Sequence, residues 1–321
     1  MNQINLQDSS TGSTARIAVD RGFNCFEFQA VVNGHTVEVI DSQPDFAEGE
    51  GRPSGNGIPI LFPFPNRIRG GRYSWDGRDY EMSADTVPFD NTGNAIHGFC
   101  LDRPWRVTSS AENYVVGEFQ LSVDAADRLI FWPADFLIEL RYELRGSTLR
   151  AEFRIANPSE TPLPWGLGTH AYFRLPLGSH SDSKHCLVQA PVTEEWELTE
   201  CLPTGTRNVI DSQTQLNEGA WFDQLTLDNV YTELTLTGGI LECLVMDERA
   251  GLQIVQRCPA LFRELVAYTP PGRNAVCLEP YTCVTDAVNL QQQGIDAGWR
   301  VLEPGGEFRT WIDISAERVI A

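Results

Sequence analysis

The fold is decided by two neighbouring stretches, Phe136-Leu-Ile-Glu-Leu-Arg-Tyr-Glu-Leu144 and Leu149-Arg-Ala-Glu-Phe-Arg-Ile155. In each stretch, an apolar side chain stands at every second position, counted from Phe136 and from Leu149. Side chains two positions apart on a strand point to the same side of the sheet, so each stretch predicts a strand with one buried face. The same parity is shared by Val115, Phe119, Leu121 and Val123, and again by Phe308, Ile312 and Ile314.

Turn signals separate these runs. Asp76-Gly77 lies between Tyr73 and Tyr80 and predicts a hairpin with a type I′ turn, because both residue types tolerate a positive φ. No apolar stripe with helical spacing extends over a dozen residues. We therefore predict an all-β fold, a large antiparallel β-sandwich. No low-complexity linker divides the chain, so residues 1–321 are expected to form a single domain.

The chain carries 24 Lys and Arg against 44 Asp and Glu, a net charge of −20. A surface this acidic repels phosphate backbones and anionic lipid, so neither nucleic acid nor a membrane surface is expected as a partner. No apolar run approaches the roughly 18 residues of a membrane helix. Acidity leaves neutral small molecules, such as sugars, open as ligands.

The eight cysteines include no CxxC pair, which argues against a zinc ribbon. The start, Met1-Asn-Gln-Ile-Asn-Leu-Gln-Asp8, lacks the basic and apolar regions of a secretory signal. We therefore expect a cytoplasmic protein with buried free thiols.

Two residues stand out as candidates for proton transfer. His170 follows the glycine-rich run Trp165-Gly-Leu-Gly-Thr169, and aromatic residues follow it. Glu279 ends an apolar run, Ala275-Val-Cys-Leu278, directly before a proline. Burial there would raise the pKa of the carboxyl into the range of a general base. On local context alone, a structural histidine and a solvated glutamate remain the alternatives.

The other histidines and motifs carry weaker signals. His97, in Asn94-Ala-Ile-His-Gly-Phe99, follows a polar loop and precedes a glycine, which is compatible with a place at a cleft, but on local context alone a structural role is favoured. His35 is expected in a hairpin turn, and His180 and His185 in a solvated loop without a third metal ligand. Gly166-Leu-Gly-Thr-His-Ala171 matches a dinucleotide motif, but prolines precede it and no helix is expected after it.

Four stretches, taken in order, resemble the aldose 1-epimerase (galactose mutarotase) family. They are Gly57-Ile-Pro-Ile-Leu-Phe-Pro-Phe-Pro-Asn-Arg-Ile-Arg-Gly-Gly-Arg-Tyr73, Asn94-Ala-Ile-His-Gly-Phe99, His170-Ala-Tyr-Phe-Arg-Leu175, and Leu278-Glu-Pro280 with Asp286-Ala-Val-Asn289. The resemblance spans about residues 20–315 and implies the galactose mutarotase-like supersandwich fold.

The resemblance also implies site roles. Glu279 corresponds to the catalytic base of the family and His170 to its acid. Arg67 and His97 correspond to residues that hold sugar hydroxyls. Asp228 resembles the sugar-binding aspartate, with Asp223 as its nearest competitor. Where many members carry asparagine, just before the histidine and near position 174, this chain has Thr169 and Arg174.

The implied activity interconverts the α and β anomers of a free aldose, and such chemistry requires no metal and no cofactor. Trp165 or Tyr172 is the candidate to cover the apolar face of the sugar. A phosphorylated or otherwise modified hexose is one alternative substrate, for which Arg69, Arg72 and Arg174 are the candidate ligands. A non-catalytic sugar-binding module is another alternative. A glycosidase is disfavoured because Glu279 has no evident carboxylate partner. The protein is expected to act as a monomer or homodimer.

Overall fold

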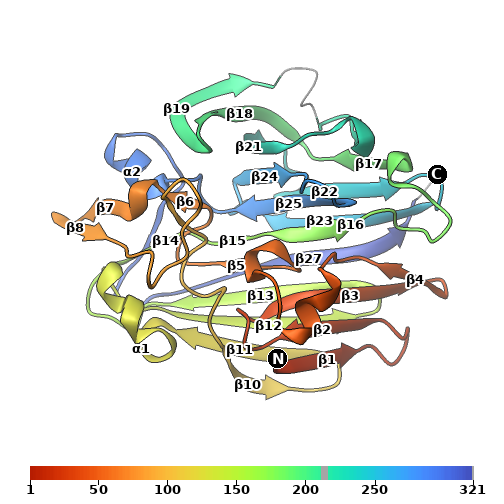
Figure 1. Ribbon diagram of the computed structural model, residues 1–321, viewed down its shortest axis with the longest axis horizontal. Helices are drawn as coiled ribbons and strands as arrows, with labels where there is room; N and C mark the ends of the chain where they lie inside the picture. The colour runs from red at the N-terminus through yellow and green to blue at the C-terminus, as the bar shows by residue number, and fades with distance from the viewer. Residues whose placement is uncertain (211–215, 320–321) are drawn as a thin grey trace.

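Two large antiparallel sheets form most of the computed structural model, which describes residues 1–210 and 216–319 (Figure 1). Strands make up 49% and helices 11% of the structure, which confirms the predicted all-β class. None of the helices in the described part of the chain has the length and apolar character needed to cross a bilayer.

The first large sheet has nine strands, two of which contain the alternating stretches 136–144 and 149–155. Its strands, in spatial order, are β10 (Arg106–Ser110), β11 (Tyr114–Gln120), β12 (Leu137–Arg145), β13 (Thr148–Ala156), β27 (Glu307–Arg318), β23 (Leu252–Pro259), β22 (Ile240–Asp247), β17 (Cys186–Gln189) and β20 (Ala220–Trp221).

The second large sheet has eight strands. In spatial order it contains β19 (Leu202–Val209), β18 (Val192–Thr199), β21 (Asp228–Leu234), β24 (Glu264–Tyr268), β25 (Ala275–Tyr281), β15 (Gly168–Thr169) and β5 (Ile60–Leu61), while β16 (Ala171–Arg174) also pairs with β25. Strands rather than a helix therefore follow the glycine-rich run, which confirms the prediction that it is no dinucleotide motif.

Smaller elements surround these sheets. A four-stranded sheet contains β1 (Gln3–Gln7), β2 (Thr14–Ala18), β3 (Asn24–Val32) and β4 (His35–Glu38). Three two-stranded sheets pair β14 (Leu163–Trp165) with β26 (Arg300–Leu302), β6 (Arg67–Ile68) with β9 (Ala95–Ile96), and β7 (Arg72–Trp75) with β8 (Arg78–Glu81). The helices are α1 (Leu121–Asp124) and α2 (Ala287–Gln292), and the 3-10 turns are η1 (Pro44–Glu48), η2 (Pro53–Gly55), η3 (Arg69–Gly71), η4 (Ala126–Phe131), η5 (Ser183–His185) and η6 (Phe222–Gln224).

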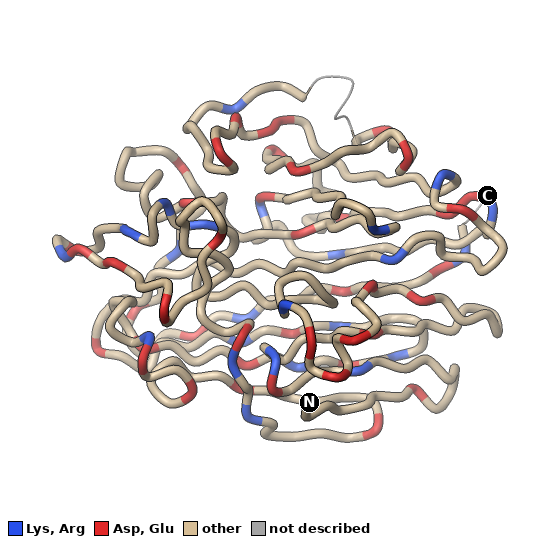
Figure 2. Tube along the Cα trace, in the orientation of Figure 1, with Lys and Arg blue, Asp and Glu red and all other residues tan. Residues whose placement is uncertain are grey.

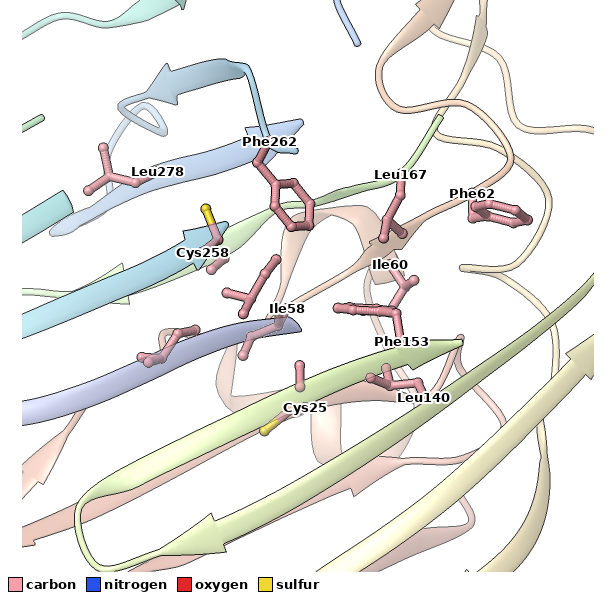
Figure 3. Packing of buried hydrophobic residues seen from close by; sticks show 14 of the residues in the cluster. Cys25, Ile58, Ile60, Phe62, Leu140, Phe153, Leu167, Cys258, Phe262 and Leu278 are labelled. Atoms are coloured by element: carbon pink, nitrogen blue, oxygen red, sulfur yellow. The ribbon is translucent and has the colours of Figure 1, made fainter. Parts of the chain in front are cut away.

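The register of β12 on β13 confirms the predicted faces. Leu140 lies opposite Phe153 and Tyr142 lies opposite Ala151, and all four side chains are buried. Figure 3 shows Leu140 and Phe153 in the core with Ile60, from the other large sheet. Burying apolar surface from both sheets in one cluster stabilises their stacking.

The predicted strand through Val123 is wrong at its end. Strand β11 stops at Gln120, the short helix α1 follows, and Val123 is 60% exposed. Two carboxylates explain the break: Asp124 accepts a hydrogen bond from the backbone of Gln120, and Asp135 accepts one from the backbone of Ser122. Such local side-chain acceptors compete with the strand ladder for backbone donors.

The predicted hairpin at Asp76-Gly77 is confirmed. Tyr73 pairs with Tyr80 and Trp75 with Arg78, which leaves a two-residue turn. Asp76 and Gly77 have φ values of 48° and 73°, as a type I′ turn requires.

Strand β25 is buried along its whole length. Val276 and Leu278 belong to the core between the large sheets, whereas Cys277, Glu279 and Tyr281 point to the opposite face of the sheet. Loops cover that opposite face, and this explains how an apolar strand can carry a glutamate.

Charge is spread over the whole molecule. Figure 2 shows acidic residues along the strands and loops of both large sheets rather than in one segment, with basic residues among them. The eight cysteines are free thiols; seven are buried, and Cys201 is half-buried.

Candidate active site

A pocket of about 350 Å³ opens on the outer face of the eight-stranded sheet. Its volume falls within the range of small-molecule sites, roughly 300–1,000 Å³. All five residues singled out from the sequence line it: Arg67, His97, His170, Asp228 and Glu279. The other lining residues are Arg52, Ser54, Gly55, Asn66, Ile96, Tyr172, Val266, Tyr268 and Tyr281.

His170 and Glu279 meet at the bottom of this pocket. Nε2 of His170 lies 3.3 Å from Oε1 of Glu279, and the two residues are 7% and 1% exposed. The other carboxylate oxygen, Oε2, accepts a hydrogen bond of 2.5 Å from the hydroxyl of Tyr281. Each carboxylate oxygen therefore has its own partner.

Burial shifts the two pKa values in opposite directions. It raises the pKa of Glu279 well above its usual range, although the hydrogen bond from Tyr281 works against this shift. It lowers the pKa of His170 to about 3. Both shifts disfavour the charged forms, so burial favours a protonated carboxyl beside a neutral imidazole.

The ring of His170 is held by Tyr172. The two rings stack at 4.6 Å with an angle of 7° between their planes. The Tyr172 hydroxyl donates to the backbone carbonyl of Ser54 at 2.9 Å, and the guanidinium of Arg273 lies 4.8 Å from the centre of the tyrosine ring. Arg273 in turn pairs with Asp41, so a chain of contacts fixes the orientation of the imidazole.

His97 approaches from the loop after β9. Its φ is 65°, a region that residues other than glycine adopt rarely. Its backbone N–H donates to the carbonyl of Asn66 at 2.7 Å, and its ring centre lies 5.8 Å from that of His170. Burial lowers the pKa of His97, so its neutral ring can both donate and accept a hydrogen bond.

Arg67 is oriented by two neighbours. Its Nε donates to Asp90 at 2.7 Å and its Nη1 to the side chain of Asn66 at 2.7 Å. Burial raises the pKa of Asp90, but hydrogen bonds from Asn94 and Arg67 outweigh it and hold that pKa well below its usual range. Asp90 therefore stays ionised and keeps the guanidinium in place. Asp90 was not among the residues predicted from the sequence.

Asp228 begins β21 and is an exposed wall of the pocket. Its competitor Asp223 lies in η6, is exposed, and is absent from the described residues that line the pocket. The structure thus favours Asp228 of the two.

Tyr172 lines the pocket, whereas Trp165 does not reach it. Trp165 is 1% exposed and packs in the core against Phe62 and Phe308, so the suggestion that it covers a sugar is wrong. Tyr268 and Tyr281 also line the pocket but were not predicted from the sequence. Tyr281 could have been found, because it lies two positions after Glu279 and therefore on the same face of the strand.

The three arginines considered for a phosphate lie outside this pocket. Arg69 pairs with Asp286, Arg72 with Glu81, and Arg174 with both Glu38 and Asp41. Arg52, which was not considered, lines the pocket instead.

The other histidines lie elsewhere. His35 begins β4 beside a hairpin turn and is exposed. His180 is exposed and His185 is half-buried, as expected for a solvated loop.

Comparison with known proteins relates this chain to a family. A family-wide sequence model described as aldose 1-epimerase matches residues 29–315. The uncharacterized protein YihR of Escherichia coli is 22% identical over 267 residues, which cover 81% of this chain and 79% of YihR.

Solved structures share the fold. A galactose mutarotase-like protein from Clostridium acetobutylicum superposes with a TM-score of 0.84 at 20% identity, over 99% of both chains. The GalM/aldose epimerase homologue from C. elegans gives a TM-score of 0.80 at 19% identity, over 99% of both chains. Identities this low support the fold alone, and they agree with the predicted galactose mutarotase-like sandwich.

Proposed function

We propose that this chain, which belongs to the aldose 1-epimerase family, interconverts the α and β anomers of a free aldose. The observation that carries the proposal is the contact between His170 and Glu279, an imidazole and a carboxyl 3.3 Å apart in one pocket of suitable size. The two oxygens that exchange protons in this reaction, O1 and O5, are bonded to the same carbon. An acid and a base that lie close together can therefore serve both.

Ring opening begins with ionised Glu279 and protonated His170. Glu279 takes the proton of the O1 hydroxyl while His170 gives a proton to O5, and the bond between C1 and O5 breaks as C1 becomes a carbonyl. Rotation about the C1–C2 bond then exposes the other face of the carbonyl to O5. In reclosure, Glu279 returns its proton to O1, and His170 takes the proton of O5. The pair carries one proton throughout.

Burial favours the proton transfers of the opening step. A raised pKa makes Glu279 a stronger base, and a lowered pKa makes His170 a stronger acid. The step converts two buried charges into two neutral groups, which is the form that burial favours. Reclosure starts from this neutral form.

The remaining groups are proposed to hold the ring. Arg67 and Asp228 can form charge-assisted hydrogen bonds with sugar hydroxyls, and neutral His97 can donate or accept. Tyr268 offers aromatic surface to the apolar face of the sugar, whereas the ring of Tyr172 is occupied by His170 and Arg273.

Polarimetry on freshly dissolved α-glucose and α-galactose tests the proposal. Glu279→Gln and His170→Asn are each expected to lower kcat by roughly 10²–10⁴-fold. Glu248→Gln and His180→Asn make the same changes at exposed positions and should leave the rate unchanged. Activity retained by either pocket variant would refute the roles. Sugar binding by the wild-type protein in calorimetry, without any catalysed rate, would favour a non-catalytic module.

A phosphorylated or otherwise anionic hexose is the second candidate substrate. It is favoured by Arg52, a cation at the pocket in a chain of net charge −20. Comparing kcat/KM for glucose and glucose 6-phosphate separates the candidates. If the phosphate is preferred, Arg52→Gln should reduce that preference; if free glucose is preferred, the variant should have little effect.

A further inference from the structure

A third buried side chain accompanies the proton-transfer pair. The thiol of Cys277, an imidazole nitrogen of His170 and a carboxylate oxygen of Glu279 all lie within 4.8 Å of one another. Cys277 does not line the pocket as described above, and the proposed reaction gives it no task.

The sheet brings these three groups together. Cys277 and Glu279 are two positions apart on β25, so they share its outer face. Tyr172 lies opposite Cys277 in the register of β16 on β25, and His170 comes two residues before Tyr172 on the same side. The cluster is therefore fixed by backbone hydrogen bonds.

A sulfur, a nitrogen and an oxygen ligand match the preferences of Zn²⁺, whereas Mg²⁺ and Ca²⁺ prefer oxygen alone. Bonds of about 2.0–2.3 Å to zinc place tetrahedral ligand atoms roughly 3.5 Å apart. The His170–Glu279 distance of 3.3 Å already fits, and the thiol needs to move inward by up to about 1.3 Å. His170 and Glu279 line the pocket, so a fourth ligand can approach from the pocket side.

The charges of the ligand set balance: a dication, a thiolate, a carboxylate and a neutral imidazole sum to zero. A neutral complex avoids the cost of leaving a charge in a buried site. Binding would release two protons, one from Cys277 and one from Glu279.

We propose that a thiophilic divalent cation, with Zn²⁺ as the representative, binds Cys277, His170 and Glu279 and inhibits the enzyme. While both members of the pair hold a metal, neither can exchange a proton with the sugar. The inhibitory effect rests on the proposed function, whereas the binding itself does not.

Two measurements test the proposal separately. Co²⁺, a spectroscopic substitute for Zn²⁺, is added to the full chain, and a thiolate-to-cobalt absorption band is expected that Zn²⁺ removes. The band should be absent in Cys277→Ala and retained in Cys258→Ala, which removes a buried thiol from the nine-stranded sheet instead. Absence of the band in the wild type, or its survival in Cys277→Ala, would overturn the site whether or not the protein is a mutarotase.

Polarimetry with and without Zn²⁺ tests the inhibition, with each variant compared with its own zinc-free rate. The Zn²⁺ concentration for half inhibition should rise more than 10–100-fold in Cys277→Ala, because that is the loss of metal affinity typical when only a hydrogen-bond partner of a ligand is removed. It should be unchanged in Cys258→Ala. A chelator should restore the wild-type rate. Equal inhibition of both variants would overturn the proposal. A cobalt band in a protein that catalyses no mutarotation would instead leave the site standing and overturn the proposed function.

Discussion

Tyr281 lies two positions after Glu279 on the same face of β25, and its hydroxyl donates a hydrogen bond of 2.5 Å to Oε2 of that carboxylate. Oε1 is then left to face His170 and the pocket. The tyrosine thus fixes the direction of the carboxylate and also stabilises its ionised form, in a site where burial opposes ionisation.

Tyr281→Phe is therefore expected to raise the pKa of Glu279 further. The reactive form of the pair carries its proton on His170, whereas burial favours that proton on Glu279. A higher pKa of Glu279 therefore lowers the reactive fraction, and with it kcat/KM, at every pH below that pKa. A hydrogen bond to a charged group is worth about 1.5–3 kcal/mol, which predicts a loss of at least ~10-fold there. The loss should disappear only above the pKa of Glu279. Tyr80→Phe, outside the pocket, is the control, and an unchanged kcat/KM for Tyr281→Phe at neutral pH would contradict this role.

Asp90 holds Arg67 through the 2.7 Å contact with Nε. Asp90→Asn removes the charge, so the guanidinium is less well oriented toward a bound sugar. We expect KM to rise by roughly 10-fold with a smaller change in kcat, as is typical when a ground-state contact is lost. Asp127→Asn, which breaks the pair with Arg103, provides the control. An unchanged KM for Asp90→Asn would show that Arg67 does not depend on this contact.

The strand faces and the proton-transfer pair could be predicted from the sequence for different reasons. Alternation at Leu140 and Phe153 reports directly on burial, because the strand period is two. His170 and Glu279 were found because adjacent residues match those of a known family. The local sequence does not predict that His170 and Glu279 lie close together. The pairing of β16 with β25 brings them into contact.

The errors and omissions have physical causes as well. Val123 was misplaced because hydrogen bonds from side chains to the backbone ended the strand. Asp90 was missed because its role depends on a loop that folds back onto Arg67. Cys277 and Tyr281 could have been found from Glu279, since strand parity puts all three on one face.

Gly98 follows His97 in the loop at the pocket. Gly98→Ala would strain the backbone and would also clash with the backbone of Phe62, and a matched variant can separate the two effects on activity. The φ of Gly98 is 78°, and an added Cβ would lie 2.1 Å from the carbonyl oxygen of Phe62. Gly98→Ala must therefore displace the loop that carries His97. Because a shift of about 1 Å in a site can cost about 10²-fold, we expect a loss of that size in kcat/KM.

Gly34→Ala is the matched control for this prediction. Gly34 lies in the turn between β3 and β4 and has a φ of 79°, but an added Cβ there meets nothing within 4 Å. It should cost about 1–2 kcal/mol of stability through its backbone conformation alone and leave the rate nearly unchanged. Similar rates for the two variants, measured by polarimetry below their melting temperatures, would exclude the clash at Phe62 as a constraint on the site.

Glu264 links the stability of the eight-stranded sheet to pH. It is fully buried, accepts a hydrogen bond of 2.9 Å from the indole of Trp196, and lies 3.3 Å from Nε of Arg263. Burial raises its pKa to about 7. The folded state therefore binds this proton more tightly than the unfolded chain, in which the ordinary value is 4.5. The resulting stabilisation is complete below pH 4.5 and is lost as the pH rises through about 7.

Glu264→Gln keeps an acceptor for Trp196 and removes the titration. The pKa difference corresponds to up to about 3 kcal/mol. Between pH 5 and pH 8 the wild type should lose up to this amount of stability through Glu264, and the variant should not. The difference in the free energy of unfolding, variant minus wild type, should therefore increase by up to that amount. Urea denaturation at several pH values measures it, with exposed Glu248→Gln as the control. Other buried groups, including Glu279, add their own pH dependence to both proteins, so the difference between the two curves is the quantity that isolates Glu264. Parallel curves would mean that Arg263 keeps the carboxylate ionised in spite of its burial.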